Sequence, residues 1–459
     1  MVQKVLKYKI WNEIPLFYLF PLFICSYFSV GFHHFDEHFQ ILEYANYKMG
    51  YSSASDLPWE FGEKIRPTLQ PWITVLFWKI SNLFFEFNPF QFAFFLRFLT
   101  AVLSVVALVG IRHTFIHTVA PQNVNWYYRV SFLLWFMPFV MVRYSSETWS
   151  ALFFAFGLIF TFSKPKIWKY FLAGLFLASS FWFRFQIAFM IFGLGLWLIF
   201  IKKEDFKYLV CMFLGFITLS LFFIYLDTVF YNQLVFTPFN YFKETILISS
   251  KNFGSYGAWY YPLMFSLHLV PPISIIILFF TLKYFYQNPK SSLTWISISF
   301  VLPHFIISHK EIRFLFPLFV FLPLILSSFQ NKFSFLVQKF KITYQIIIIL
   351  NCVLLVFIMF KPADIMIFNF KQLSDNGRLN NYVYLKSDLK TKIFPGLVMN
   401  YYKTFSIDST KANYIIDNSS KIKVNTPFLI DDNYYKGFFL TKMGDNFEEY
   451  TIKKNKAKD

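Results

Sequence analysis

The sequence predicts a polytopic α-helical membrane protein of about eleven transmembrane helices, with one interfacial helix and a small C-terminal soluble α/β domain. Two observations predict the membrane part. Of the 459 residues, 56% are hydrophobic and 24% aromatic, while only 15% are charged, against roughly 25% in an ordinary soluble protein. Apolar runs near the length of about 20 residues that crosses a bilayer recur along the chain. A third observation predicts the soluble domain, because these long runs give way to short alternating ones after Lys361.

The predicted apolar spans begin soon after a basic N-terminal stretch. In chain order they are 14–31, 67–84, 90–111, 130–142, 147–162, 170–183, 185–201, 208–229, 260–282, 292–308, 313–329 and 343–360. A signal peptide is an alternative for the first span, but no small-residue cleavage site follows it, so we expect a retained helix. The spans 130–142 and 170–183 are short for a crossing helix.

The basic loops set the orientation. Lysines cluster at 164–169, 202–207, 283–290 and 332–341, and positively charged short loops face the cytoplasm. All four clusters face inward only if 67–84 does not cross. We therefore expect 67–84 to be a re-entrant or interfacial helix, with the N-terminus inside and the C-terminus outside. Two prolines and Gln70 suit that segment.

The net charge of +18 is consistent with nucleic-acid binding, but basic residues that flank membrane segments explain it better. We expect the lipid bilayer as a partner and no nucleic acid. The three cysteines, Cys25, Cys211 and Cys352, lie in apolar runs. Their spacing matches neither a disulfide framework nor a metal site.

Two domains are expected. Residues 1–360 form the membrane domain, whose outer loop 32–89 carries an acidic motif. Residues 361–459 form an extracytoplasmic soluble domain, since alternating runs such as Tyr382-Val-Tyr-Leu and Tyr414-Ile-Ile predict strands. A hairpin is expected around Gly444-Asp-Asn. Of the 25 acidic residues, 11 lie in this tail, and most of the others map to the outer face.

The acidic motif is His33-His-Phe-Asp-Glu-His-Phe-Gln40, directly after the first span. Ionisable residues beside the membrane are functional candidates by default. A carboxylate of Asp36 or Glu37 could act as general base on a sugar hydroxyl. The plainer alternative is that the pair caps a helix over 37–49.

A second cluster is His309-Lys-Glu-Ile-Arg313, at the outer mouth of two spans. Lys310 and Arg313 could bind a phosphate, for which arginine offers bidentate hydrogen bonds. The alternative is an ion-paired turn that Glu311 neutralises.

Other polar residues map to the same outer level. Arg143 and Arg184 lie at ends of apolar spans, where an arginine can simply reach toward the interface. Asp227 and Asn240 lie in an expected outer loop over 227–259 and could bind substrate hydroxyls.

Several motifs of cytoplasmic chemistry are absent from the sequence. It contains no GxxxxGK[ST], no dinucleotide fingerprint and no HExxH. No predicted cytoplasmic loop is long enough for a nucleotide-binding domain. A lipid-borne substrate that is reached from the outer leaflet therefore fits better than a nucleotide sugar.

Five motifs occur in one order over roughly residues 10–330. They are Phe35-Asp-Glu-His-Phe-Gln-Ile-Leu-Glu43, Trp59-Glu-Phe61 with Arg66, Asp227…Tyr231…Thr237-Pro-Phe-Asn240, Gly254-Ser-Tyr-Gly, and His309-Lys-Glu-Ile-Arg-Phe-Leu-Phe-Pro317. This set resembles the polyprenyl- and dolichyl-phosphate-mannose-dependent α-mannosyltransferases of GPI-anchor and N-glycan assembly, in the GT-C superfamily. One departure is Phe35, where the family usually has proline.

The resemblance implies an inverting transfer of mannose from polyprenyl-phosphate-mannose to a glycan or glycolipid acceptor, which forms an α-mannoside on the extracytoplasmic face. It implies Asp36 as the base, with Glu37 orienting the acceptor or sharing the role. The expected phosphate ligands are His309, Lys310 and Arg313. The expected substrate contacts are His38, Gln40, Arg66, Arg143, Arg184, Asp227 and Asn240. No metal or cofactor is expected, because a lipid phosphate already leaves as a good anion.

Other functions stay open at this point. A GT-C transferase of another lipid-linked sugar would have the same motifs. A transporter or flippase of a lipid-linked saccharide would instead carry polar residues deep in its spans and internal repeats, and a structural scaffold would need neither charged motif. The resemblance alone implies the endoplasmic reticulum. The richness in Phe, Ile, Lys and Asn favours a bacterial inner membrane with an outward-facing site.

Overall fold

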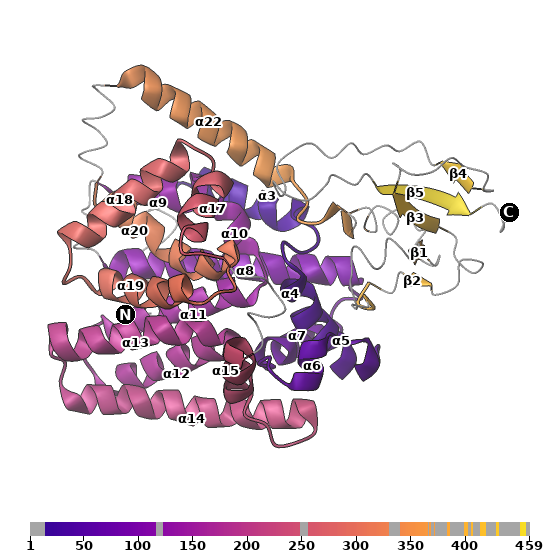
Figure 1. Ribbon diagram of the computed structural model, residues 1–459, viewed down its shortest axis with the longest axis horizontal. Helices are drawn as coiled ribbons and strands as arrows, with labels where there is room; N and C mark the ends of the chain where they lie inside the picture. The colour runs from indigo at the N-terminus through magenta and orange to yellow at the C-terminus, as the bar shows by residue number, and fades with distance from the viewer. Residues whose placement is uncertain are drawn as a thin grey trace. The chain divides into compact units, whose positions relative to one another are not determined.

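The computed structural model describes residues 14–115, 123–247, 256–329 and 340–365, together with short stretches of the C-terminal part (367–368, 371, 383–385, 399–402, 405–406, 414–418, 428–430 and 450–455). The chain forms two compact units (Figure 1). The helical unit comprises Met1–Ser29, Glu63–Gln70 and Phe94–Lys361. The mixed unit comprises Val30–Gly62, Pro71–Ala93 and Pro362–Asp459. The expected hairpin around Gly444 lies outside the described residues.

The helical unit is a bundle of apolar helices. They are η1 (Leu16–Leu19) with α3 (Phe20–Phe28), α8 (Pro89–Thr114), α9 (Val124–Leu133), α10 (Met137–Val142), α11 (Ser146–Thr161), α12 (Ile167–Phe183), η5 (Phe185–Ile187) with α13 (Ala188–Leu196) and η6 (Trp197–Lys202), α14 (Phe206–Tyr231), α15 (Thr237–Leu247), α17 (Tyr260–His268), α18 (Ile273–Gln287), α19 (Ser292–Ile306), η7 (Ile312–Phe321) with α20 (Leu322–Ser327), and α22 (Lys341–Phe360).

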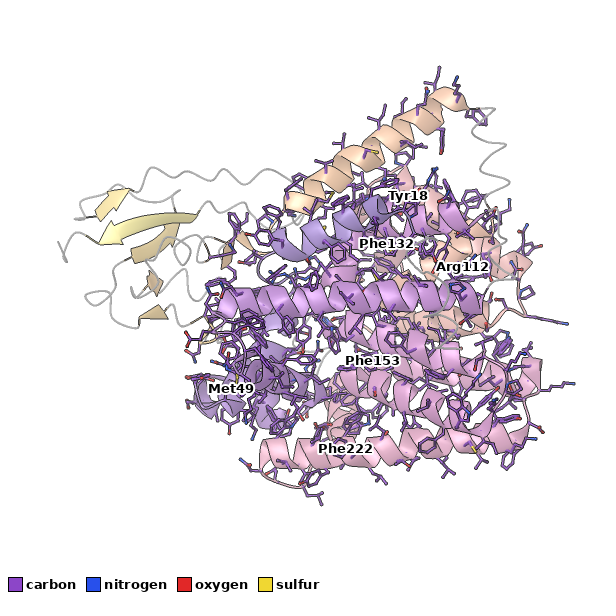
Figure 2. All side chains as sticks on the ribbon, turned by 180° about the vertical axis from the view of Figure 1, so that it is seen from behind. Tyr18, Met49, Arg112, Phe132, Phe153 and Phe222 are labelled. Atoms are coloured by element: carbon purple, nitrogen blue, oxygen red, sulfur yellow. The ribbon has the colours of Figure 1, made fainter. Side chains whose placement is uncertain are left out.

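Four of the described helices are long and apolar enough to cross a membrane: Pro89–Thr114, Phe185–Lys202, Phe206–Tyr231 and Lys341–Phe360. Five shorter apolar helices accompany them. Many large apolar side chains of α14 are exposed, among them Phe213, Leu221 and Phe222, the last labelled on this helix in Figure 2. An exposed face this apolar is stable against lipid tails rather than water.

Helices α12 and α14 pack with their backbones almost in contact. A Cβ atom built at Gly174 would lie 2.0 Å from the carbonyl oxygen of Met212, and one at Gly215 would lie 2.2 Å from that of Phe171. Only glycine fits at either position. Small residues at such crossings are typical of membrane helix pairs, because they let the two backbones approach closely.

Two of the predicted spans, each expected as one helix, are divided between two helices in the structure. The span expected over 260–282 is interrupted between α17 and α18, where Pro271 and Pro272 supply no backbone N–H to continue the helix. The span expected over 130–142 is interrupted at Leu134, whose backbone is extended, and α10 restarts with Pro138 in its first turn. The single-helix predictions for these two segments are wrong.

The segment expected at the interface contains α7 (Leu69–Ser81), with 13 residues. At 1.5 Å per residue such a helix is about 20 Å long, shorter than the hydrocarbon core of about 30 Å. Ile80 in its last turn, and Leu83, Phe84 and Phe85 just after its end, are exposed. These properties are compatible with an interfacial helix.

The mixed unit contains short helices and a small sheet. Its short helices are α4 (Phe35–Glu37), the π-helical η2 (His38–Leu42), α5 (Glu43–Lys48), η3 (Ala54–Asp56) and α6 (Trp59–Glu63). The strands are β1 (Val383–Leu385), β2 (Phe405–Ser406), β3 (Tyr414–Asn418), β4 (Phe428–Ile430) and β5 (Tyr450–Asn455), in the order β2-β1-β3-β5-β4. Strand β1 runs parallel to β2 and β3, and β5 runs antiparallel to β3 and β4. The alternating runs at 383–385 and 414–416 are thus strands, as their pattern predicts.

Candidate active site

Two buried arginines bind the C-terminal end of α3. Arg97 Nε donates to the carbonyl oxygen of Ser26 at 2.8 Å, and Arg143 Nη1 donates to that of Ser29 at 2.9 Å. Cations stabilise the carbonyl end of a helix, where the last C=O groups have no intrahelical partner. The structure shows Arg143 bound to the end of α3, and its expected contact with substrate stays a prediction.

The chain then turns sharply at Gly31. Its φ of +87° is accessible to glycine but strained for other residues, and a Cβ there would lie 2.6 Å from Cβ of Asp364. The N–H groups of Ala363 and Asp364 donate to the carbonyl oxygen of Val30 at 2.9 and 3.0 Å. Residues 363–364 therefore hold the turn that leads into the acidic motif.

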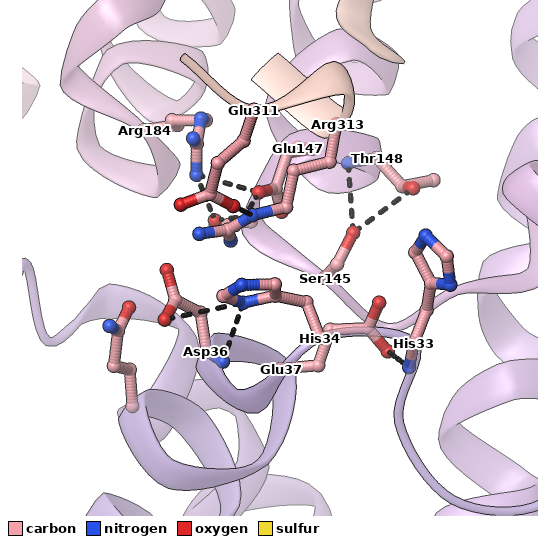
Figure 3. Close-up of polar contacts among 12 residues, drawn as sticks. His33, His34, Asp36, Glu37, Ser145, Glu147, Thr148, Arg184, Glu311 and Arg313 are labelled. Carbon is pink, nitrogen blue, oxygen red and sulfur yellow. Dashed lines mark hydrogen bonds and ion pairs between the residues drawn. The ribbon is translucent and has the colours of Figure 1, made fainter. Parts of the chain in front are cut away.

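The acidic residues lie on one short helical turn, α4 (Figure 3). Glu37 is 7% exposed, and its Oε2 accepts from the backbone N–H of His33 at 3.3 Å. The side chain of Asp36 is 16% exposed. The N–H of Asp36 donates to Nδ1 of His34 at 3.2 Å, so this ring nitrogen acts as an acceptor. Asp36 is the more accessible carboxylate of the pair.

The two polar side chains that follow are turned inward. His38 is 1% exposed and its Nε2 lies 2.9 Å from Oε1 of Glu43. Gln40 Nε2 donates to Oε1 of buried Glu60 at 3.1 Å. Both His38 and Gln40 were expected to contact substrate, and both have partners inside the mixed unit.

The helical unit holds a buried cluster of opposite charges (Figure 3). Glu147, in the first turn of α11, accepts at Oε1 from Nη1 of Arg184 and Nη1 of Arg313, each at 2.9 Å. Their side chains are only 3–7% exposed. Arg313 Nε also donates to Glu311. We call Glu147, Arg184, Glu311 and Arg313 the arginine cluster.

Arg184 keeps one N–H donor that no described residue of this cluster accepts. It lies where α12 ends, with an extended backbone (φ −154°, ψ 114°). Its Nη1 also donates to Oγ of Ser146 at 3.1 Å, while its buried Nε has no hydrogen-bond partner among the described residues. The guanidinium lies 5.1 Å from the ring centroid of Phe314, which excludes water from one side.

Lys310 binds the backbone. Its Nζ donates to the carbonyl oxygens of His304, Phe305 and Ile307, at the end of α19. An ammonium has three protons, and each has a carbonyl here, while burial lowers the pKa of the group. The geometry is that of a helix C-cap. The phosphate role expected for Lys310 would require the loss of these bonds. The other expected phosphate ligand, His309, bonds through Nε2 to Glu311 at 2.9 Å.

Asp227 and Asn240 lie on helices, whereas a loop was expected over 227–259. Asp227 belongs to the last turns of α14, and α15 begins at Thr237. Residues 248–255 of that expected loop lie outside the described part of the chain. The prediction of a continuous loop is wrong for the described residues, because the apolar run of α14 continues past Asp227 to Tyr231.

These helices hold the backbone of residues 64–68. Buried Asp227 accepts at Oδ1 from the N–H and the hydroxyl of Thr68, at 2.9 and 2.5 Å, and at Oδ2 from the hydroxyl of Thr237. Tyr231 donates to the carbonyl oxygen of Arg66 at 2.8 Å. Asn240 Nδ2 donates to that of Lys64 at 3.3 Å. Asp227 and Asn240 thus fix the main chain around Arg66.

Sequence reasoning did not assign roles to Glu43, Thr68, Arg97 or His304. Glu43 and Arg97 are buried charges, and a charge inside an apolar or amphipathic segment is the one signal that could have found them. Arg97 and Glu43 each have a partner in a distant part of the chain, Ser26 and the 400–401 backbone, which no local pattern reveals. Among the described residues, no three His, Cys, Asp or Glu side chains are placed to hold a metal ion.

The sequence and the fold of this chain both resemble known proteins. The sequence pattern of the family described as "Alg9-like mannosyltransferase family" matches residues 14–386. GPI mannosyltransferase 3 of Candida albicans is 24% identical over 320 residues, which cover 68% of this chain and 61% of the relative. The chain thus spans about three fifths of the length of that relative.

A solved structure shares the fold. The crystal structure of ArnT from Cupriavidus metallidurans bound to undecaprenyl phosphate superposes with a TM-score of 0.52 at 10% sequence identity, over 78% of this chain and 71% of ArnT.

Proposed function

Because the chain belongs to the Alg9-like mannosyltransferase family, we propose that it moves mannose from a polyprenyl-phosphate-linked donor to a hydroxyl of a glycan or glycolipid acceptor. Membership of this family confirms the resemblance that the motifs indicate. The chain is an integral membrane protein with a helical GT-C fold, as its apolar helices and the likeness to ArnT show. The donor, the acceptor and the residues that act on them are our proposal.

The arginine cluster carries the proposal. A glycosyl phosphate donor releases a lipid phosphate, and buried cations stabilise the negative charge as it develops. Arg184 and Arg313 are buried, and both donate to the same oxygen of Glu147, Oε1. Guanidinium groups bind phosphate through paired N–H donors. ArnT, whose structure contains undecaprenyl phosphate, supports the same class of lipid phosphate for this chain.

Asp36 is the proposed general base. Its carboxylate accepts the proton of the acceptor hydroxyl, and that oxygen forms a bond to the anomeric carbon from the face opposite the phosphate. The bond between that carbon and the phosphate oxygen breaks, and the lipid phosphate leaves with the electron pair. Inversion at a β-linked donor then gives the α-mannoside. Asp36 is preferred because Glu37 is more buried and accepts from His33. No cofactor or metal is part of this proposal.

The other candidate residues are given supporting roles. We assign the contacts with the phosphate of the sugar donor to Arg184 and Arg313. His309 is assigned the role of holding Glu311, to which it bonds. Arg66 is retained as a substrate contact, and Asp227 and Asn240 hold its main chain. Lys310 is assigned to the end of α19 rather than to the phosphate.

Topology and location complete the proposal. We propose eleven crossings with α7 at the interface, a catalytic membrane domain over 1–360 and an extracytoplasmic domain over 361–459. The bacterial inner membrane with an outward-facing site is favoured by composition. The fungal relative favours the endoplasmic reticulum as the alternative. Labelling of single introduced cysteines in the lysine-rich loops and in the tail, from each side of the membrane, tests the orientation.

The activity is tested with purified protein in liposomes, supplied with radiolabelled polyprenyl-phosphate-mannose or GDP-mannose and a panel of mannoside acceptors. We expect transfer from the lipid donor alone, and its loss in the Asp36→Asn/Glu37→Gln variant. Transfer from GDP-mannose would overturn both the donor and the proposed topology. Full activity in the double variant would overturn the assignment of the acids.

A second candidate is the transfer of another lipid-linked sugar. The observation that favours it is the arginine cluster itself, because cations that bind a lipid phosphate do not select the sugar attached to it. Competition between polyprenyl-phosphate-mannose and other polyprenyl-phosphate sugars separates the two. A transporter or flippase of lipid-linked saccharides would move the donor between leaflets with no transfer to any acceptor.

A further inference from the structure

A short stretch of the C-terminal part packs against the acidic motif within the mixed unit. We call residues 399–402 the strap. Met399, Tyr401 and Tyr402 are only 2–3% exposed. Tyr401 donates to the carbonyl oxygen of Pro89 at 3.3 Å, and Asn400 Nδ2 donates to Oδ2 of Asp56 at 3.0 Å. The strap is therefore an integral part of the unit that carries Asp36 and Glu37.

Glu43 binds the backbone of the strap. Its Oε1 accepts from the N–H of Asn400 at 2.8 Å, from the N–H of Tyr401 at 2.9 Å, and bonds to Nε2 of His38 at 2.9 Å. The side chain is 1% exposed. An ionised carboxylate is the acceptor that suits three donors at one oxygen, and such charge-assisted bonds are about twice as strong as neutral ones.

Tyr402 of the strap adds ring stacking to the hydrogen bonds of Glu43. Tyr402 stacks on His38 with centroids 5.5 Å apart and an interplanar angle of 12°, and on Phe90 at 4.5 Å and 19°. His38 is thus held by Glu43 through Nε2 and by Tyr402 through its face.

A π-helical turn explains why His38 and Glu43 meet. They are five residues apart, which places them on different faces of an α-helix with 3.6 residues per turn. In the π-helical turn His38–Leu42 the N–H of Glu43 donates to the carbonyl oxygen of His38, so residues five apart align. This turn follows Asp36 and Glu37 directly in the chain.

We propose that Glu43 is a positioning residue for Asp36: it joins the strap to the π-helical turn and thereby fixes the orientation of the acidic turn. The inference rests on the proposed function, because it takes Asp36 as the base. It also gives the C-terminal part a role in the transferase site through residues 399–402. Glu43 itself does not touch substrate.

The first arm of the test measures amide hydrogen exchange in the full-length protein. Glu43→Gln keeps the shape of the side chain and removes the charge, and Glu43→Asp keeps the charge and shortens the reach. Glu86→Gln is the matched control, because Glu86 is exposed. We expect the amides of Asn400 and Tyr401 to exchange at least about tenfold faster in both Glu43 variants, since bonds to a charged acceptor are lost, and to be unchanged in Glu86→Gln.

The second arm measures transfer kinetics in the same proteins. We expect kcat to fall about 100-fold in Glu43→Gln, the effect of a base displaced by about 1 Å, while KM for the lipid donor stays within about twofold of wild type. A general loss of structure would instead reduce the active fraction and the melting temperature. Tyr402→Leu weakens the strap from its other side without changing Glu43, and predicts a smaller fall in kcat of the same kind.

The outcomes separate the two proposals. Unchanged exchange at 400–401 in Glu43→Gln would refute the binding of the strap. Faster exchange with an unchanged kcat would refute the positioning role. If wild-type protein transfers no sugar from any donor, the proposed function fails and the positioning role with it, while the exchange arm still decides whether Glu43 holds the strap.

Discussion

The Glu147→Gln substitution tests the arginine cluster as a structural element. Glu147 supplies one carboxylate oxygen to Nη1 of Arg184 and to Nη1 of Arg313, both at 2.9 Å, and all three side chains are at most 7% exposed. The substitution keeps the size of the side chain and removes the only charge that Arg184 pairs with among the described ion pairs. Breaking a buried ion pair from one side costs about 3–5 kcal/mol, because a buried charge is left uncompensated.

We therefore expect Glu147→Gln to lower the free energy of unfolding by about 3–5 kcal/mol and the melting temperature by several degrees. The assay is thermal unfolding of detergent-purified protein, followed by tryptophan fluorescence. The matched control is Glu63→Gln at an exposed position, where surface substitutions change stability by less than about 0.5 kcal/mol.

A double variant sharpens this test. Glu147→Gln with Arg313→Met also removes one of the two cations that share Glu147, so its cost falls below the sum of the single variants, with a coupling of about 0.5–3 kcal/mol. Additive costs, or a Glu147→Gln variant as stable as Glu63→Gln, would refute the reasoning that these buried charges depend on one another.

Three further predictions concern other parts of the structure. Gly174→Ala lowers the melting temperature, at a cost of about 1–3 kcal/mol of overpacking, because its new Cβ meets the backbone of α14, whereas Gly195→Ala does not, because nothing lies within 4 Å of a Cβ there. Asp227→Asn lowers the free energy of unfolding by about 2 kcal/mol and exposes residues 64–68 to protease, since Thr68 loses an ionised acceptor. An unchanged cleavage pattern would contradict this role of Asp227. Burial lowers the pKa of Lys361 to about 8, so the folded protein releases that proton at lower pH than the unfolded chain, and stability rises with pH between about 8 and 10.5. Pulse acetylation at increasing pH should show half-maximal reaction of Lys361 near pH 8, and a midpoint above pH 10 would contradict it.

The membrane class was predictable because it depends on composition and on apolar runs that are readable one segment at a time. Helix breaks inside such runs were harder to predict. Leu134 and the Pro271–Pro272 pair both interrupt apolar stretches, and hydropathy does not register a break that changes no polarity. The prolines were a usable signal for the second break, because they remove backbone donors.

The site was predictable only in part. The motifs around Asp36 and Arg313 are visible because several titratable groups crowd into a few positions. The actual partners are not visible, since Glu147 and Arg313 are 166 residues apart. The carbonyl groups that Arg143 and Lys310 bind were not predictable, because a sequence shows a charge but not the helix end beside it.

Glu43 shows a different limit. Its partner His38 lies five residues away, a spacing that α-helical periodicity separates and that only the π-helical turn aligns. The other two donors come from Asn400 and Tyr401, more than 350 residues later in the chain. No local pattern carries that information.

The role of Asp36 as the base is tested by the initial rate of mannose transfer from polyprenyl-phosphate-mannose by wild-type, Asp36→Asn and Glu37→Gln proteins in the same liposomes. General base catalysis contributes about 10²–10⁴-fold. We expect a fall in kcat within that range for Asp36→Asn, a smaller fall for Glu37→Gln, and donor binding within about twofold of wild type in both. An Asp36→Asn protein that transfers mannose at the wild-type rate would show that Asp36 is not the base.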